Sequence, residues 1–203
     1  MALRLQELHP TIVHAPIALL PLAVGAEILG AITDRQVFRT FGRRAITLAA
    51  AGAVGAAVTG LIAGEEVNVE GETRDMLQTH RNLNALATVV AITMAVWRHQ
   101  VRKPDALYLA AGVAGVGVVT YTGYLGGELV YEHGVGVDPA KGVWRPDAPQ
   151  LSRRQIGAFV RDAAVDVWHG LKHMGEELAQ GKIVPALVRR RPQQQKAVAE
   201  AAD

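Results

Sequence analysis

The chain has 203 residues, of which 50% are hydrophobic and 20% charged, and its formal net charge is +2. It contains no cysteine, which excludes disulfide bonds, Cys-ligated iron–sulfur clusters, thiol catalysis and covalent c-type haem attachment. A metal ion or a haem would therefore have to be held by His, Met, Tyr or carboxylate side chains.

The first apolar segment runs from Ile12 to Ile32, and its only ionisable residues are His14 and Glu27. As a helix its 21 residues would span roughly 30 Å, the hydrocarbon thickness of a bilayer. The segment is too long for the core of a signal peptide. We therefore expect it to remain in the protein as a membrane helix, with His9 and His14 at its entrance.

Three more apolar segments follow. Residues 45–64 are uncharged and rich in Ala and Gly, residues 81–98 contain the mainly apolar segment Leu83–Trp97 of only 15 residues, and residues 107–127 are uncharged and rich in Gly. The third segment is the weakest candidate, because a span usually needs about 17 to 25 residues. Four spans with short loops predict an all-α fold, an integral membrane four-helix antiparallel bundle.

Basic residues in short loops predict the orientation of such a bundle. They are concentrated in the first and third loops: Arg35, Arg39, Arg43, Arg44, Arg98, Arg102 and Lys103. The second loop is mainly acidic. We therefore expect the first and third loops in the cytoplasm and both termini outside, in the inner membrane of a bacterium.

This topology brings four histidines to one membrane face. His9 and His14 enter the first span, His80 precedes the third, and His133 follows the fourth. Neutral imidazole is a common ligand of metals and haem, and polar groups near hydrocarbon are costly without a partner. The pattern predicts a cofactor site built from His14, His80 and His133, with His9 as a further candidate ligand.

The spacing of the histidines restricts their roles. In a continuous helix His9 and His14 would lie about 7.5 Å apart along the axis and roughly 140° around it, so they would not chelate one ion together. Pro10 is typical of a first helical turn. This predicts that His9 lies outside the helix like a cap and that His14 is the better inward ligand.

Histidines on facing helices are typical of b-type haem, and Arg81, next to His80, is positioned to pair with the haem propionates. A zinc or copper ion held by the same histidines is the alternative, although it needs three or four ligands at one point.

Three motifs resemble the DUF2231 family of predicted bacterial membrane proteins. They are His-Pro-x-x-x-His-x-Pro-Ile-Ala-Leu-Leu from His9, the isolated His80, and Gly-Gly-Glu-Leu-Val-Tyr-Glu-His-Gly-Val-Gly-Val from Gly126. The resemblance covers about residues 6–137 and implies four membrane helices. Some members are joined to Rieske-type iron–sulfur domains, which implies redox or haem chemistry. This chain has Ala15 where the family commonly has an aromatic residue, and it contains no iron–sulfur domain.

The remainder of the chain is predicted to be an accessory region. We expect a linker over 138–151, an amphipathic helix over 152–181 that begins with a capping box of Ser152 and Gln155, and a disordered basic tail over 182–203. A helix of this kind lies on a membrane surface or against a partner.

The sequence thus predicts a membrane-bound b-type haem protein that transfers electrons. A hydrolase is not expected, because no set of Ser, His and Asp lies outside the apolar segments. The expected partners are the lipid bilayer and a redox protein or quinone, with a homo-oligomer left open and no nucleic acid. The alternatives are a His-rich zinc or copper protein and a non-catalytic scaffold whose tail helix recruits a partner.

Overall fold

A computed structural model describes residues 3–136, 150–151 and 156–188. Its helices are α1 (Leu5–Ile12), α2 (His14–Thr33), α3 (Gln36–Glu66), α4 (Gly71–Gln100), α5 (Ala106–Tyr131), α6 (Ile156–Ala179) and α7 (Pro185–Val188). Two strands of two residues each, β1 (Leu3–Arg4) and β2 (Gln150–Leu151), pair antiparallel. The structure is otherwise helical, which confirms the predicted all-α class.

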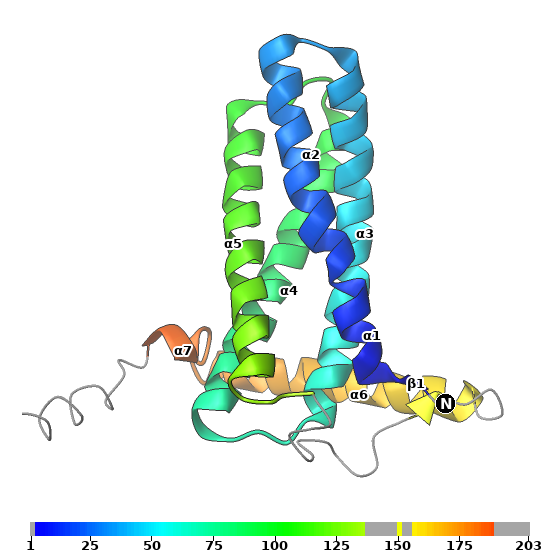
Figure 1. Ribbon diagram of the computed structural model, residues 1–203, viewed down its shortest axis with the longest axis vertical. Coiled ribbons are helices and arrows are strands. Elements are labelled where there is room, and N and C mark those ends of the chain that lie inside the picture. Colours follow the sequence, from blue (N-terminus) through cyan, green and yellow to red (C-terminus); the bar gives the residue numbers. More distant parts are fainter. Residues whose placement is uncertain (1–2, 137–149, 152–155, 189–203) are drawn as a thin grey trace, which may run out of the picture.

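The four long helices α2 to α5 stand side by side, and α6 crosses them near the lower end of Figure 1. Only Asp34 and Arg35 separate α2 from α3, so α3 returns alongside α2. Asp34 makes this turn with a φ of 54°, in the left-handed region that Asp tolerates. Arg39 stabilises the turn by donating hydrogen bonds to the Asp34 side chain at 2.6 Å and to its carbonyl at 2.9 Å.

Three helical stretches of the described chain are long and apolar enough to cross a membrane: Leu8–Thr33, Gln36–Glu66 and Ala106–Tyr131. They contain three of the four predicted spans. The helix that contains the third segment, α4, begins at Gly71, ten residues before the predicted start at 81. Hydropathy marks the apolar part of a helix, whereas the polar residues of 71–80 continue the same helix beyond it.

The chain bends between α1 and α2. Pro16 has no N–H group to donate to the carbonyl of Ile12, and the break falls between these residues, at Val13. Pro10 lies inside α1 rather than in a first turn. The prediction that His9 lies outside the helix as a cap is therefore wrong, because the helix begins at Leu5, before the proline.

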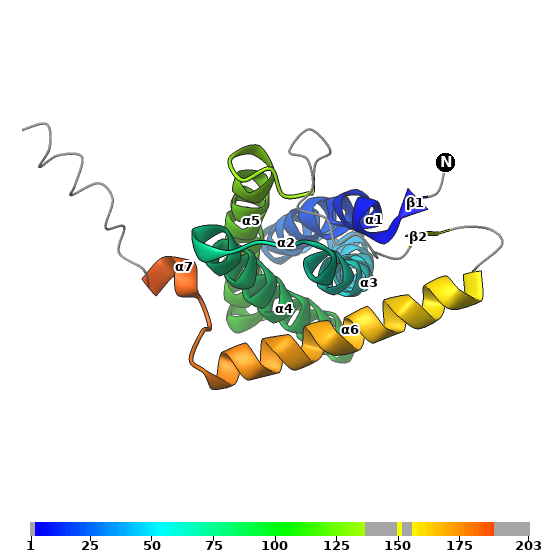
Figure 2. The same cartoon turned by 90° about the horizontal axis from the view of Figure 1, so that it is seen from below.

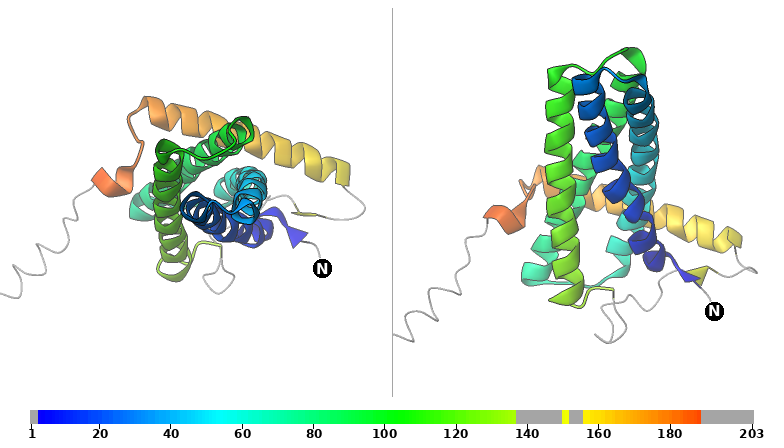
Figure 3. Two further views of the ribbon diagram at one scale, coloured as in Figure 1. Left: turned by 90° about the horizontal axis from the view of Figure 1, so that it is seen from above. Right: turned by 45° about the horizontal axis from the view of Figure 1, so that its top comes forward.

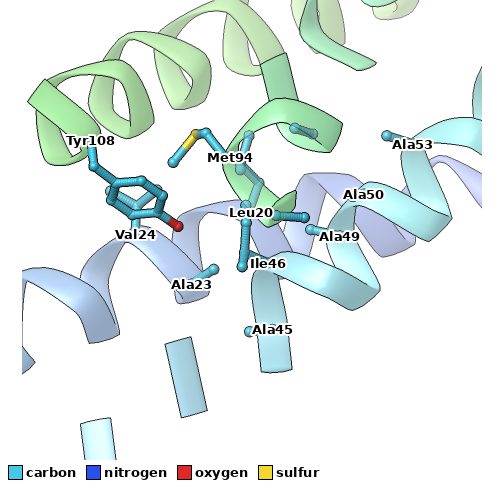
Figure 4. Close-up of a cluster of buried hydrophobic side chains, with 12 residues drawn as sticks. Leu20, Ala23, Val24, Ala45, Ile46, Ala49, Ala50, Ala53, Met94 and Tyr108 are labelled. Atoms are coloured by element: carbon cyan, nitrogen blue, oxygen red, sulfur yellow. The ribbon is translucent and has the colours of Figure 1, made fainter. Parts of the chain in front are cut away.

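The core of the bundle lies between α2, α3, α4 and α5 (Figure 4). Small residues let the backbones of α2 and α3 approach closely; on α3 these are Ala45, Ala49, Ala50 and Ala53. Ile46, Met94 and Tyr108 are the largest apolar or aromatic side chains that are almost completely buried there. Trp97 meets Tyr108 edge to face, with ring centroids 5.6 Å apart.

The C-terminal region folds back onto the bundle. Helix α6 packs against α3, and α7 packs against α4. The Asn82 side chain donates hydrogen bonds to the carbonyls of Lys182 and Ile183, at 3.2 and 2.8 Å. The expectation of a disordered tail from residue 182 is therefore wrong for 182–188, because these contacts hold the segment. Residues 189–203, the capping box at Ser152 and Gln155, and most of the linker lie outside the described residues.

Candidate histidine site

Two of the four predicted histidines meet inside the bundle. His9 of α1 and His80 of α4 have ring centroids 6.5 Å apart and ring planes nearly perpendicular, at 88°. Both side chains are partly buried. They come from segments 71 residues apart in the chain, and the two rings face each other edge to face in the lower part of the bundle.

Both imidazoles are held through the same ring nitrogen. His9 Nδ1 lies 3.0 Å from the carbonyl oxygen of Ala56, and His80 Nδ1 lies 2.9 Å from that of Thr122. A carbonyl can only accept, so Nδ1 carries the proton in each ring, and the lone pair of each neutral imidazole is on Nε2. Histidines that bind metals are commonly oriented by such a second hydrogen bond.

Glycines make room for the two rings. A Cβ atom added at Gly60 would lie 2.9 Å from Cε1 of His9, and one added at Gly126 would lie 3.1 Å from Cε1 of His80. The first distance is a clash and the second is tighter than ordinary van der Waals contact. The helices α3 and α5 therefore present bare backbone to the imidazoles, and larger residues would displace them.

A polar network that the sequence analysis did not include surrounds His80. The Asn84 amide donates to Nε2 of His80 at 3.2 Å and accepts from the Thr122 hydroxyl at 3.1 Å. Thr122 thus contacts His80 through its carbonyl and Asn84 through its hydroxyl. The i, i+4 spacing of His80 and Asn84 could have indicated this contact, because such residues share one helix face.

The other predicted ligands lie apart from this pair. His14 is exposed at the start of α2, so the expected roles of His9 and His14 are reversed in the structure: the bend at Val13 turns His9 inward. His133 is partly buried, and its Nδ1 lies 3.0 Å from the hydroxyl of Thr73. Arg81 forms an ion pair with Glu177 of α6.

The predicted gathering of histidines at one end of the bundle is supported by His9, His80 and His133. The bond between His133 and Thr73 places the end of α5 beside the first turn of α4, at the same lower end (Figure 1). Within the part of the chain that the structure describes, no three His, Cys, Asp or Glu side chains form a group that could hold a metal ion.

These features define a helical membrane protein with a pair of imidazoles at one end. A family model described as "Predicted membrane protein (DUF2231)" matches residues 6–139, and the chain belongs to this family. The family assignment made from the three motifs is therefore confirmed. No curated protein and no solved structure matches the chain.

Proposed function

We propose that this protein is a four-span membrane protein that binds b-type haem through His9 and His80 and takes part in electron transfer. The observation that carries the proposal is the convergence of two imidazoles whose Nδ1 atoms are both held by backbone carbonyls. Each ring then offers Nε2 as a ligand. His14 and His133, which the sequence analysis favoured, have no part in this pair.

In this proposal α4 forms the fourth span of an antiparallel bundle. Its exposed large apolar side chains recur at helical spacing and form one stripe suited to lipid: Leu86, Val89, Ile92 and Val96. Its charged residue Arg98 is instead buried and paired with Glu27 of α2. A helix of low overall hydropathy can cross a bilayer when its polar groups are satisfied inside the bundle.

The number of converging histidines favours haem over a zinc or copper ion. A porphyrin supplies four nitrogen ligands to its iron, so two histidines on different helices complete the coordination. A tetrahedral zinc site needs four ligands, and a copper site needs a comparable set. Two converging imidazoles match the requirement of haem.

The residues around the pair fit this group. Neutral imidazoles are the form that binds iron, and Gly60 and Gly126 let the two rings pack directly against the backbones of α3 and α5. The Asn84 amide must release Nε2 of His80 for a bond to iron to form. Bound haem supplies reversible one-electron chemistry. The chain's own residues orient the two rings and partly bury them.

The basic loop residues indicate how the bundle is oriented in the membrane. The end of the bundle opposite the histidine pair carries the basic loop residues, including Arg35, Arg102 and Lys103. Basic residues in short loops favour the cytoplasm. The histidine pair then lies at the outer face of a bacterial inner membrane, and both termini are outside.

A reduced-minus-oxidised visible spectrum of the detergent-purified full chain, with metal analysis of the same sample, tests the proposal. We expect b-type bands and haem in the wild type, loss of both in His9→Ala, and an unchanged spectrum in the matched control His14→Ala. His80→Met, which keeps an iron ligand, should retain haem with a higher reduction potential. A chain without haem after expression with haem supplied, or a His9→Ala variant with the wild-type spectrum, would overturn it.

A further inference from the structure

Helix α6 lies across the bundle rather than along it. Figures 2 and 3 show it running past α3 and α4 on one side of the bundle. Gly170 is a point of close approach, because a Cβ atom added there would lie 3.3 Å from Cδ2 of Leu61 on α3. The absence of a side chain at Gly170 lets the two helices touch.

One flank of α6 faces the lower end of the bundle. His173 Nδ1 lies 3.0 Å from a carboxylate oxygen of Glu65, and Glu65 is one helical turn nearer the lower end of α3 than Leu61. Polar residues dominate the same flank as His173: Asp162, His169 and Glu176. This polar flank therefore points away from the apolar part of the bundle.

The opposite flank of α6 is apolar and exposed. Leu171 lies two residues before His173, which places it about 200° around the helix. Val160, Ala164, Leu171 and Leu178 form this apolar flank. Val160 is 58% exposed, Leu171 44% and Leu178 40%. Because the polar flank points to the lower end of the bundle, the apolar flank points the opposite way along the bundle axis, towards the level of the apolar midsection.

Helix α6 cannot roll about its axis to hide this flank. Glu177 is buried and accepts hydrogen bonds from Gln78, at 2.5 Å, and from Arg81. Arg74 adds an ion pair to the same carboxylate at 3.5 Å. This cluster of Gln78, Arg81, Arg74 and Glu177, which we call the Glu177 latch, fixes both the rotation of α6 and its level on the bundle.

We infer that α6 lies in the headgroup layer of the bilayer, with Val160, Leu171 and Leu178 in contact with lipid acyl chains. Above Leu61, α3 exposes Val58 and Val54, so the apolar flank of α6 is continuous with the lipid-facing surface of a membrane-length helix.

The outward side of α6 fits the same position. Trp168 is 66% exposed, as is typical of aromatic residues at the membrane interface. Arg161 and Lys172 are also exposed and suit anionic lipid headgroups. The partner of this surface is the lipid bilayer itself, and not a second protein. The latch residues Gln78 and Arg81 lie close to His80 in the sequence. The histidine pair therefore lies near the same headgroup layer as α6.

The absence of cysteine allows a direct test with single-cysteine variants carrying a nitroxide label. The full chain is reconstituted into phosphatidylcholine vesicles containing phosphatidylglycerol, and accessibility to oxygen and to a water-soluble nickel chelate is measured by electron paramagnetic resonance. We expect Val160→Cys and Leu171→Cys to favour oxygen several-fold, whereas the matched variants His169→Cys and Glu176→Cys on the polar flank favour nickel.

Two results would overturn the inference. If all four positions are equally accessible to nickel, α6 lies in water. If positions 160 and 171 are shielded from both reagents, a protein or a second copy of the chain covers the flank. The labelled positions are all exposed, so the variants should fold, and their helix content is checked by circular dichroism. The outcome is independent of whether haem binds.

Discussion

Arg98 of α4 donates a hydrogen bond from Nε to Oε1 of Glu27 on α2, at 2.5 Å, and the two side chains are 3% and 1% exposed. This buried ion pair joins the two helices near the end of the bundle opposite the histidines. Arg98 also donates to the carbonyl of Val101 at 2.9 Å. The acid in the first apolar segment is therefore held within the bundle and does not extend into the lipid headgroups.

Breaking this pair should strongly destabilise the protein. We expect Glu27→Ala to lower the free energy of unfolding by about 3–5 kcal/mol, because it leaves Arg98 buried without its counter-charge. The double variant Glu27→Leu/Arg98→Met should lose less, since no charge remains buried. Unfolding in mixed detergent micelles measures both. Asp34→Asn is the control, because its ion pairs with Arg39 and Lys103 are at an exposed turn, and it should change stability little.

The space around Glu27 should tolerate no additional atom. A Cβ atom added at Gly42 of α3 would lie 2.7 Å from Cγ of Glu27, so Gly42→Ala should push the carboxylate away from Arg98 and destabilise the protein. Gly25→Ala is the matched control, because nothing lies within 4 Å of an added Cβ there. This control should be neutral or gain about 0.5–1 kcal/mol. Equal effects of the two variants in the same unfolding assay would contradict the expected contact.

If the proposed haem site is right, Gly126 should be important for it. An added Cβ atom would lie 3.1 Å from Cε1 of His80, so Gly126→Ala should shift the ring and lower the haem content of the purified protein. Gly123→Ala lies one turn away on α5, where an added Cβ meets nothing within 4 Å, and should bind haem like the wild type. The ratio of Soret to protein absorbance measures the effect, and identical ratios would exclude contact between Gly126 and the site.

The attachment of α6 should depend on pH. Burial alone would raise the pKa of Glu177, but the hydrogen bonds and charges of Arg81 and Arg74 outweigh it and hold the pKa below its ordinary value of 4.5. The folded state then binds this proton less readily than the unfolded state. The contribution of the Glu177 latch is therefore complete above pH 4.5 and is lost as the pH falls through the lower, folded value.

The motion of a nitroxide label at position 171 reports this release. We expect the label to become more mobile on acidification below the ordinary pKa, and Glu177→Gln to be partly released already at neutral pH, because it removes charged hydrogen bonds worth about 1.5–3 kcal/mol each. A wild-type spectrum for Glu177→Gln at all pH values would show that other contacts, such as that of Gly170 with Leu61, hold the helix by themselves.

Much of the fold is determined locally. The apolar segments predicted the positions of the long helices, because helix formation and exclusion from water depend on consecutive residues. The gathering of His9, His80 and His133 at one end follows from counting helices through short loops. The three motifs sufficed for the family assignment, since they are contiguous in the chain.

The rotation of each helix and the contacts between distant segments were decided by the tertiary structure. His9 rather than His14 faces His80, because the bend at Val13 turns α1 relative to α2. Asn84 and Glu177 acquire their roles only when α4 meets α5 and α6. Hydropathy and spacing report how a residue relates to its neighbours in sequence, whereas the partner of a buried polar group is chosen by packing between helices far apart in the chain.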